Sequence, residues 1–334
     1  MPEFTTPQII SIVIFIVVFA LIISEKVHRT VAALAGAVVL ILTGILSFDT
    51  GMEHIDFGTL GVLVGMMIFV AVVKNSGIFE YIAIRTAKIA KGNPWVIMVL
   101  FCIITAVLSA FLDNVTTVLL IGPVTFTVCK MLELSPVPFF ITEIMASNIG
   151  GTATLIGDPP NIIIGTSLGY TFFDFIENTG AVVGICFVCM LVYFTLCFRK
   201  ELLHAEHANG GPVTCPEPST AITNKKAFLA SAGVFLLAVV LLITHAQTEL
   251  SVACIGVIVA ILTMIVLGLT SGKKSVIEII KGVDYKTLLF FIGLFVSVAG
   301  LEKTGVLNMI ANFITSVSEG NIAVIVIVIL WLSA

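Results

Sequence analysis

The chain has 334 residues, of which 59% are hydrophobic and only 11% are charged, and its formal net charge is −4. Ordinary soluble domains have roughly 25% charged residues, so this chain has too few charges to cover a soluble surface. The composition therefore argues against a soluble protein and predicts an all-α polytopic membrane protein. Its partner is then the lipid bilayer, and the small net charge gives no sign of a nucleic-acid partner.

Seven apolar segments have nearly the length of a membrane-spanning helix, which needs about 20 mainly apolar residues. In chain order they are Ile9–Ile23, Val31–Ser47, Thr59–Val73, Thr179–Phe198, Ala227–Thr244, Leu250–Thr270 and Thr287–Leu301. The first lacks the basic start and the cleavage site of a signal peptide, so we expect it to stay in the mature protein. Phe79–Gly92 has basic residues at three-residue spacing opposite apolar ones, which predicts an amphipathic helix along the membrane surface. These first helices, within residues 8–92, form a predicted scaffold.

The region between residues 94 and 170 differs because polar and helix-breaking residues interrupt its apolar stretches. The interruptions fall at residues 113–114, 147–151 and 157–161. Irregular backbone at membrane depth is tolerated only where protein or a water-filled cavity satisfies its polar groups. We therefore predict a re-entrant hairpin over residues 94–131 and a broken membrane helix over residues 136–170, followed by a helix over residues 179–198.

Residues 201–226 form the one long polar stretch, rich in proline and glycine, and are predicted to be a cytoplasmic linker between two halves. His204 and His207 lie beside Glu201 and Glu206 there. A metal site is conceivable at this spacing, but a solvated loop is the favoured interpretation.

The two halves repeat one another in sequence. Asp56, Thr59, Leu60, Gly65 and Gly77 recur as Asp284, Thr287, Leu288, Gly293 and Gly305 at a single offset (284 − 56 = 228). Glycines shared at fixed spacing are hard to obtain from hydrophobicity alone. The sequence therefore predicts a first repeat over residues 1–200 and a second over residues 227–334.

The distribution of basic residues predicts how the chain crosses the membrane. If the N-terminus lies outside, then all 16 lysines and arginines except Lys303 lie inside, as the positive-inside rule requires. The first repeat then crosses five times, so the second is upside down relative to it. This inverted repeat is typical of alternating-access transporters. We expect a multi-pass protein of the plasma membrane with a cytoplasmic linker.

The second repeat stops early. Ser333 and Ala334 correspond to Ser109 and Ala110, which come just before the first break of the first repeat. By the logic of the repeat, roughly a hundred residues would be missing. We therefore expect a fragment with a truncated second repeat, and its activity on its own is open.

Asp113 is the first candidate site residue because it lies between two apolar stretches. A carboxylate near the bilayer centre costs about 2.5–3.5 kcal/mol and usually marks an ion path or a proton relay. Asn114, Thr116 and Thr117 add oxygens within one turn, and oxygen ligands suit a hard cation such as Na⁺. Alternatively, Asp113 caps a helix, and the two roles can hold together.

A second polar cluster surrounds paired glycines. Its candidate ion- or substrate-binding residues are Ser147, Asn148, Gly150, Gly151, Thr152, Thr154, Asp158, Pro159 and Asn161. Glycines let the backbone unwind and approach a ligand, and Pro159 can start a half-helix whose N-terminal end would attract an anion. Glu143, one turn before Ser147, could reach the site, but a structural role is as well supported.

The motifs at residues 111–117 and 150–161 resemble those of the ion transporter superfamily, in its arsenite-permease and melanosomal P-protein branch, which is related to sodium:dicarboxylate symporters. The resemblance spans nearly the whole chain. It implies a homodimer with a scaffold domain and a moving transport domain. It also implies that Asn114, Ser147 and Asn148 coordinate Na⁺ or guide protons, and that the stretch from Asp158 to Asn161 lines the substrate side.

One departure bears on the substrate. Dicarboxylate members carry Ser-Asn-Thr at the hairpin tip, where this chain has Asp113, Asn114 and Val115. A fixed negative charge would repel a carboxylate unless a cation or proton neutralises it first. This favours cation/proton exchange or a neutral solute such as arsenous acid, without excluding citrate.

The leading hypothesis is a secondary transporter of a small ion or solute, with Na⁺ or H⁺ as coupling ion and no other cofactor. An ion channel and a non-transporting membrane subunit are the alternatives. An intramembrane aspartyl protease would use Asp113 and Asp158 as a dyad, but their neighbours suit ligation better. No enzymatic activity is expected.

Overall fold

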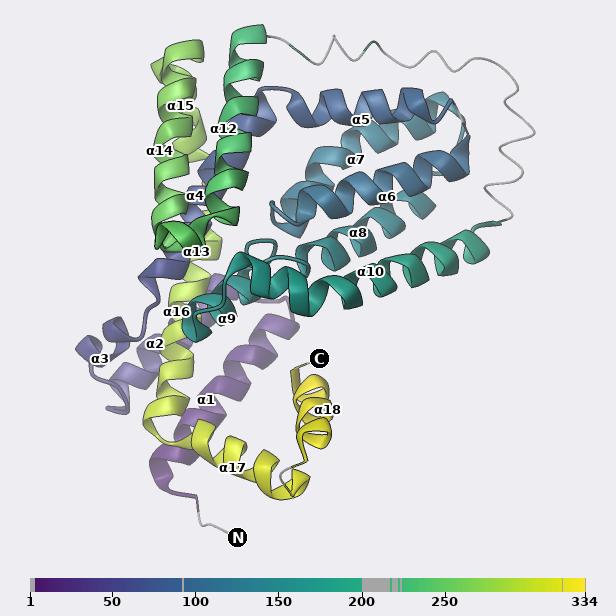
Figure 1. Cartoon of the computed structure of the whole chain (residues 1–334). Coiled ribbons are helices and arrows are strands. Elements are labelled where there is room, and N and C mark those ends of the chain that lie inside the picture. Colours follow the sequence, from purple (N-terminus) through teal and green to yellow (C-terminus); the bar gives the residue numbers. More distant parts are fainter. Residues whose placement is uncertain are drawn as a thin grey trace. The chain divides into compact units, whose positions relative to one another are not determined.

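The computed structural model describes residues 4–91, 93–199, 217, 222, 224–319 and 321–333. Among these residues the secondary structure is helical, with no strand, so the all-α prediction is confirmed (Figure 1). The helices are α1 (Thr6–Ile23), α2 (Arg29–Leu42), α3 (Phe48–Glu53), α4 (Phe57–Asn75), α5 (Ile78–Ile89), α6 (Pro94–Ser109), α7 (Asn114–Met131), α8 (Val137–Gly151), α9 (Pro159–Leu168), α10 (Phe172–Cys197), α12 (Lys225–Ile243), α13 (His245–Thr248), α14 (Val252–Ser271), α15 (Lys273–Lys281), α16 (Tyr285–Lys303), α17 (Val306–Ser318) and α18 (Ile322–Ser333).

Within the described part of the chain, seven helices are long and apolar enough to cross a membrane. They are α1, α4, α7, α10, α12, α14 and α16. Six of them match predicted segments, and the seventh, α7, is the second arm of the predicted hairpin. The exception is the predicted segment Val31–Ser47, because α2 ends at Leu42 and the chain turns at Gly44, whose φ is +75°.

Helix α10 begins at Phe172, seven residues before the predicted start at Thr179, because Thr171 caps it. The backbone N–H of Asp174 donates to the Thr171 hydroxyl at 3.2 Å, and the Asp174 carboxylate accepts from the N–H of Thr171 at 2.7 Å. This reciprocal pair is a capping box, which satisfies two backbone donors at a helix start.

The helices form two compact units, residues 1–57 with 284–334 and residues 58–283. These units do not coincide with the two predicted repeats, because each unit contains helices from both. The repeat boundaries stay a prediction. The predicted linker lies almost wholly outside the described residues, and so do the two histidines within it.

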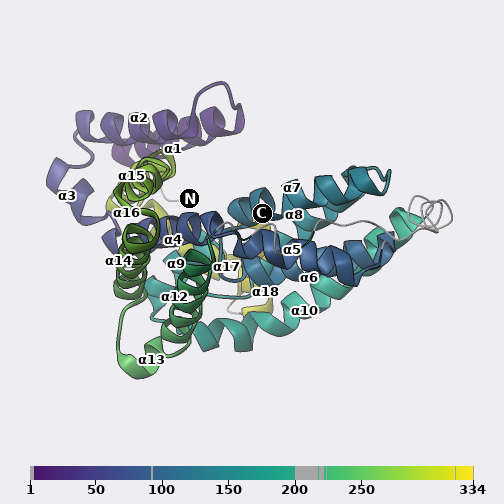
Figure 2. The same ribbon diagram turned by 90° about the horizontal axis from the view of Figure 1, so that it is seen from above.

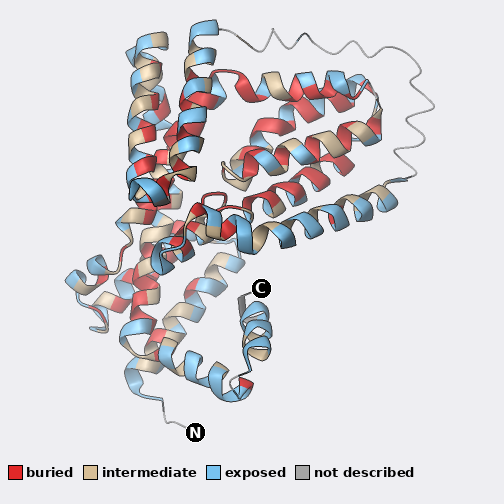
Figure 3. Cartoon of the chain, in the orientation of Figure 1, coloured by how far each residue is buried: buried red, intermediate tan, exposed pale blue. Residues whose placement is uncertain are grey.

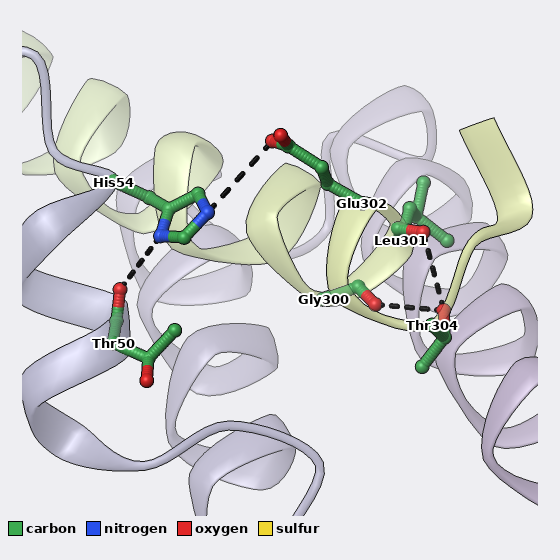
Figure 4. Close-up of polar contacts among 6 residues, drawn as sticks. All are labelled: Thr50, His54, Gly300, Leu301, Glu302 and Thr304. Atoms are coloured by element: carbon green, nitrogen blue, oxygen red, sulfur yellow. Dashed lines mark hydrogen bonds and ion pairs between the residues drawn. The ribbon is translucent and has the colours of Figure 1, made fainter. Parts of the chain in front are cut away.

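The first unit is built around the pairing of α2 with α16. A Cβ placed on Gly293 of α16 would lie 2.6 Å from the carbonyl carbon of Ala33 in α2, so the two backbones touch. The Thr30 hydroxyl donates to the Lys286 carbonyl at 2.9 Å at one end of the pair. At the other end, His54 Nε2 lies 3.8 Å from a carboxylate oxygen of Glu302, while its Nδ1 lies 2.8 Å from the Thr50 carbonyl (Figure 4).

In the second unit, α4 packs against α12 and α14. A Cβ on Gly65 of α4 would lie 2.4 Å from the carbonyl oxygen of Gly256 in α14, which again shows direct backbone contact. Phe69 of α4 stacks on Phe235 of α12, with ring centroids 5.9 Å apart. Rings packed in this way contribute about 0.5–1.5 kcal/mol beyond their buried area.

The same unit contains α5, α6, α7 and α8, which run alongside one another in both views (Figures 1 and 2). Helix α5 has one buried side, which includes Phe79, Ala83 and Ala87, and its position along the membrane surface stays a prediction. Helix α10 packs on α8 but is exposed over most of its length, with Phe172, Phe175 and Met190 as its buried residues (Figure 3). An apolar helix with this exposure is one that lipid can cover.

Local features of the two repeats agree with one another. Gly77 joins α4 to α5 with φ of +80°, and Gly305 joins α16 to α17 with φ of +77°. Both have the left-handed conformation that glycine adopts without steric cost. The two junctions are therefore alike, whereas the two-repeat organisation and its inverted orientation stay predictions.

Candidate functional site

The turn between α6 and α7 is held by Asp113. Its carboxylate oxygen Oδ1 accepts from the backbone N–H of Thr116 at 2.9 Å, so Asp113 caps α7. The Thr117 hydroxyl is buried and donates to the Asp113 carbonyl at 2.9 Å. The capping role is thus present, and it engages only one of the two carboxylate oxygens among the described contacts. Thr116 contributes its backbone to the turn.

The end of α8 meets this turn through a pair of asparagines. Asn114 Nδ2 donates to Asn148 Oδ1 at 2.7 Å, across 34 residues of sequence. The Thr154 hydroxyl, just beyond α8, donates to the Ala110 carbonyl in the turn. The two predicted breaks therefore lie side by side in the second unit, which is what a shared site requires.

The segment between α8 and α9 is irregular, and the side chain of Asn161 holds it by hydrogen bonds to its backbone. The Asn161 amide donates to the carbonyls of Gly151 at 3.2 Å and Thr154 at 2.8 Å. Pro159 is the first residue of α9, as the sequence predicted. An irregular segment from Thr152 to Asp158 thus separates α8 from α9, and that the two helices form one broken membrane helix stays a prediction.

Close backbone packing explains the glycines at this break. A Cβ on Gly150 would lie 2.2 Å from the Ala106 carbonyl oxygen of α6, and one on Gly157 would lie 2.2 Å from the Gly151 carbonyl oxygen. Gly151 leaves room for Asp158, whose Oδ2 would lie 2.7 Å from an added Cβ. Distances below 3.0 Å are not tolerated between such atoms. Side chains at these positions would push α6 and α8 apart or displace the aspartate.

The site contains two carboxylates, those of Asp113 and Asp158. Asp158 makes no side-chain hydrogen bond to cap α9, and the charge of Asp113 is close enough to act on it. Neither carboxylate has an ion-pair partner in the described part of the chain. Two nearby carboxylates disfavour one another's ionisation unless a cation or proton joins them. Since Pro159 and Pro160 have no N–H to donate, the start of α9 offers an anion little more than its dipole.

Several predicted site residues use their hydroxyls on backbone. Ser147 is buried and donates to the Ile144 carbonyl at 2.9 Å, and Thr152 donates to the Asn148 carbonyl at 2.9 Å. Such hydroxyls can act as ligands only through their remaining lone pairs. The structure brings together Asp113, Asn114, Asn148 and Asp158. The two asparagine amides already bond one another and nearby backbone, so the two carboxylates are the less committed groups of the four. Their binding roles stay predictions.

Glu143 does not reach this cluster through any described contact. It lies on α8, one turn before Ser147, with 1% of its surface exposed, and Oε1 accepts from the Thr125 hydroxyl of α7 at 2.6 Å. Its other oxygen, Oε2, is buried without a hydrogen-bond partner in the described structure.

Two buried hydroxyls of α6, those of Thr105 and Ser109, were not among the predicted site residues. Both lack a hydrogen-bond partner among the described residues. Their spacing of four residues, on an otherwise apolar helix, places them on one face and was the available signal. The described residues contain no group of three or more His, Cys, Asp or Glu side chains that could hold a metal ion.

Paired helix breaks with facing polar groups, in a chain rich in membrane-length helices, are typical of a membrane transporter. The model of the citrate transporter family matches residues 19–334. The chain therefore belongs to the citrate transporter family, within the ion transporter superfamily, which confirms the resemblance drawn from the two motifs.

Three relatives from mycobacteria and from human agree with this assignment. An uncharacterized transporter of Mycobacterium tuberculosis is 38% identical over 331 residues, which cover 98% of this chain and 76% of the relative. The 46 kDa membrane protein of Mycobacterium leprae is 37% identical over 330 residues, with the same two shares. The P protein of Homo sapiens is 44% identical over 189 residues, or 54% of this chain and 22% of that protein.

Proposed function

We propose that the chain is a secondary active transporter that moves a small ion or solute by alternating access, coupled to a gradient of Na⁺ or H⁺. The observation that carries this proposal is the meeting of two helix breaks, where Asn114 donates to Asn148 and the charge of Asp113 acts on Asp158. The candidate solutes are arsenite, a citrate- or dicarboxylate-type anion, and Na⁺ exchanged for H⁺. The family name supports the second of these.

The paired aspartates suggest an order of binding. With Asp113 and Asp158 ionised, the site would repel a carboxylate and attract a cation. A coupling Na⁺ or proton therefore binds first, and an anionic solute binds once the charge is lowered. Cation binding to oxygen ligands needs no further cofactor.

Contacts between distant segments support the predicted orientation. The N–H of Phe172 at the start of α10 donates to His245 at the α12–α13 turn, and both are predicted to lie outside. Trp95 at the start of α6 donates to Thr195 near the end of α10, and both are predicted to lie inside. These pairs agree with the predicted grouping of segments on the two sides of the membrane. We propose in addition that the protein is a multi-pass protein of the plasma membrane, with the N-terminus outside and the linker cytoplasmic. We further propose that it works as a homodimer.

The test is uptake into proteoliposomes that contain the purified chain. Radiolabelled citrate and arsenite serve as probes, each with a Na⁺ gradient, a pH gradient or no gradient. We expect saturable uptake of at least one probe only when a gradient is present. Asp158→Asn should reduce it by at least tenfold, while Asp49→Asn, on the short helix α3 of the first unit, should leave it unchanged.

Other outcomes separate the alternatives. Flux that does not saturate and needs no coupling gradient would mean an ion channel. No flux of either probe, or of Na⁺ against H⁺, through a well-folded chain would favour a non-transporting membrane subunit and contradict the proposal.

A further inference from the structure

Glu143 is an unusual residue for the inside of a helix bundle. It projects from α8 toward α7, is 1% exposed, and satisfies one carboxylate oxygen through the Thr125 hydroxyl. Its Oε2 is buried and unpartnered within the described structure. A buried oxygen left in this state costs free energy in any protein, and more so if it carries a charge.

Among the described residues, no positive charge acts on Glu143. The titratable groups near enough to feel its charge are two thiols, Cys102 of α6 and Cys129 of α7. Helix α10, which also packs on α8, adds no charge that acts on Glu143 as far as the described residues go. An ionised carboxylate without a cation in such surroundings is unfavourable, so the group favours a bound proton.

Polar side chains continue from Glu143 toward the helix breaks. Ser147 lies one turn further along the same face of α8, and Asn148 follows it in the candidate site. On α6, the helix packed against α8, the unpartnered hydroxyls of Thr105 and Ser109 lie along one face. Cys102, on the same helix, hydrogen-bonds Thr142 beside Glu143. The packed helices α6 and α8 thus both carry polar side chains, here called the hydroxyl row, in the stretch that leads from Glu143 to the helix breaks, and no described hydrogen bond joins them to Glu143.

We propose that Glu143 is a proton-binding residue: its Oε2 takes up a proton from water at the helix breaks and releases it there, through the hydroxyl row on α6 and α8. The carboxylate becomes a neutral acid while Oε1 keeps the bond from Thr125. The further role of this proton, coupling to solute movement, rests on the proposed transport function, whereas proton binding itself does not.

The direct test is infrared spectroscopy of the full chain in lipid, as a difference between acidic and alkaline buffer. A protonated carboxylic acid has a carbonyl stretch separate from those of carboxylates and amides. We expect such a band in the wild type, its loss in Glu143→Gln, and its retention in Glu177→Gln. Glu177 is a matched control because it is an exposed helical glutamate of the same unit.

A second variant guards against a failure of Glu143→Gln to fold. Thr125→Val keeps the shape of the side chain and removes the hydroxyl that donates to Oε1. The carbonyl band of Glu143 should then shift in position, since its hydrogen bonding has changed. A band that Glu143→Gln and Thr125→Val both leave untouched, in samples that elute as single species, would overturn the proposal.

Transport measurements separate proton binding by Glu143 from its role in coupling to solute movement. In proteoliposomes, Glu143→Gln should abolish the dependence of uptake on the pH gradient, because its amide cannot exchange a proton. Unchanged dependence would overturn the coupling role. A band lost in Glu143→Gln, in a chain that moves no probe, would uphold proton binding and refute the proposed function instead.

Discussion

Single side chains at the helix breaks serve the backbone and the site at once. Asp113 caps α7 with one carboxylate oxygen, and the hydroxyls of Thr117 and Thr154 close turns on carbonyl groups. Polar residues that a sequence pattern marks as ligands are therefore partly occupied in holding the break open. The groups least occupied in this way are the carboxylates of Asp113 and Asp158, because the asparagine pair bonds itself and nearby backbone.

We predict that Asp113 can lose its charge without losing its cap. Asn and Asp are nearly equal as N-cap residues. In choline, the free energy of unfolding of Asp113→Asn should therefore lie within about 0.5 kcal/mol of that of the wild type. If Na⁺ binds at Asp113, the wild type gains stability in Na⁺, by about 2.7 kcal/mol at a hundred times the dissociation constant.

The measurement is the melting temperature of the purified chain in Na⁺ and in choline. A rise in Na⁺ that Asp113→Asn lacks would place the cation at this residue. An equal rise in both proteins would show that Na⁺ binds elsewhere, and no rise in either would favour the proton as coupling ion.

Gly150 gives a second prediction at this scale. An added methyl group would meet the Ala106 carbonyl, so Gly150→Ala should destabilise the chain by about 1–3 kcal/mol, as overpacking does. Gly184 of α10 is the control, since a Cβ there meets nothing within 4 Å. Gly184→Ala should be neutral or stabilising by about 0.5–1 kcal/mol, because alanine favours helix. Equal melting temperatures for the two variants would contradict the packing argument.

Elements were largely predictable because hydrophobic runs and breaking residues are local signals. The sequence located α12, α14 and α16 to within a few residues. It misplaced the start of α10, since the capping box at Thr171 precedes the apolar run. Pairings between helices were not predictable. No local sequence pattern indicates that Gly65 packs on Gly256, or that the Thr105 hydroxyl lacks a hydrogen-bond partner among the described residues. Such contacts depend on which helices meet.

One contact between elements should respond to pH. His245, at the turn after α12, accepts from the N–H of Phe172 at 2.9 Å and must be neutral at Nε2 to do so. Burial lowers the pKa of His245, and the nearby Asp174 opposes this only in part. A lowered pKa means that the stabilisation is complete above the ordinary value of about 6.5 and is lost as the pH falls.

We therefore expect the melting temperature of the wild type to fall between pH 7.5 and pH 5 by more than that of His245→Gln. Glutamine can still accept the hydrogen bond but does not titrate. The comparison is made by thermal melts across this pH range, and parallel curves for the two proteins would show that His245 contributes nothing to the pH dependence.

At the scale of the whole molecule, the orientation can be tested in cells. In a chain without native cysteines, Thr248→Cys lies at a turn predicted to be outside, and Lys273→Cys lies at one predicted to be inside. A membrane-impermeant maleimide should label the first in intact cells and the second only after permeabilisation. The opposite pattern would invert the topology.

The composition of the two units has a consequence for synthesis on the ribosome. Helices α1 and α2 belong with α16, and α4 belongs with α14, so neither unit is completed by the first repeat. Helices α1 and α2 can pack on one another early, but α2 meets α16 only after residue 284 has been made. Pairing over such sequence distances is slow, since a long loop must close first. The contacts of α2 with α16 and of α4 with α14 therefore form only after the helices between them in sequence have been synthesised.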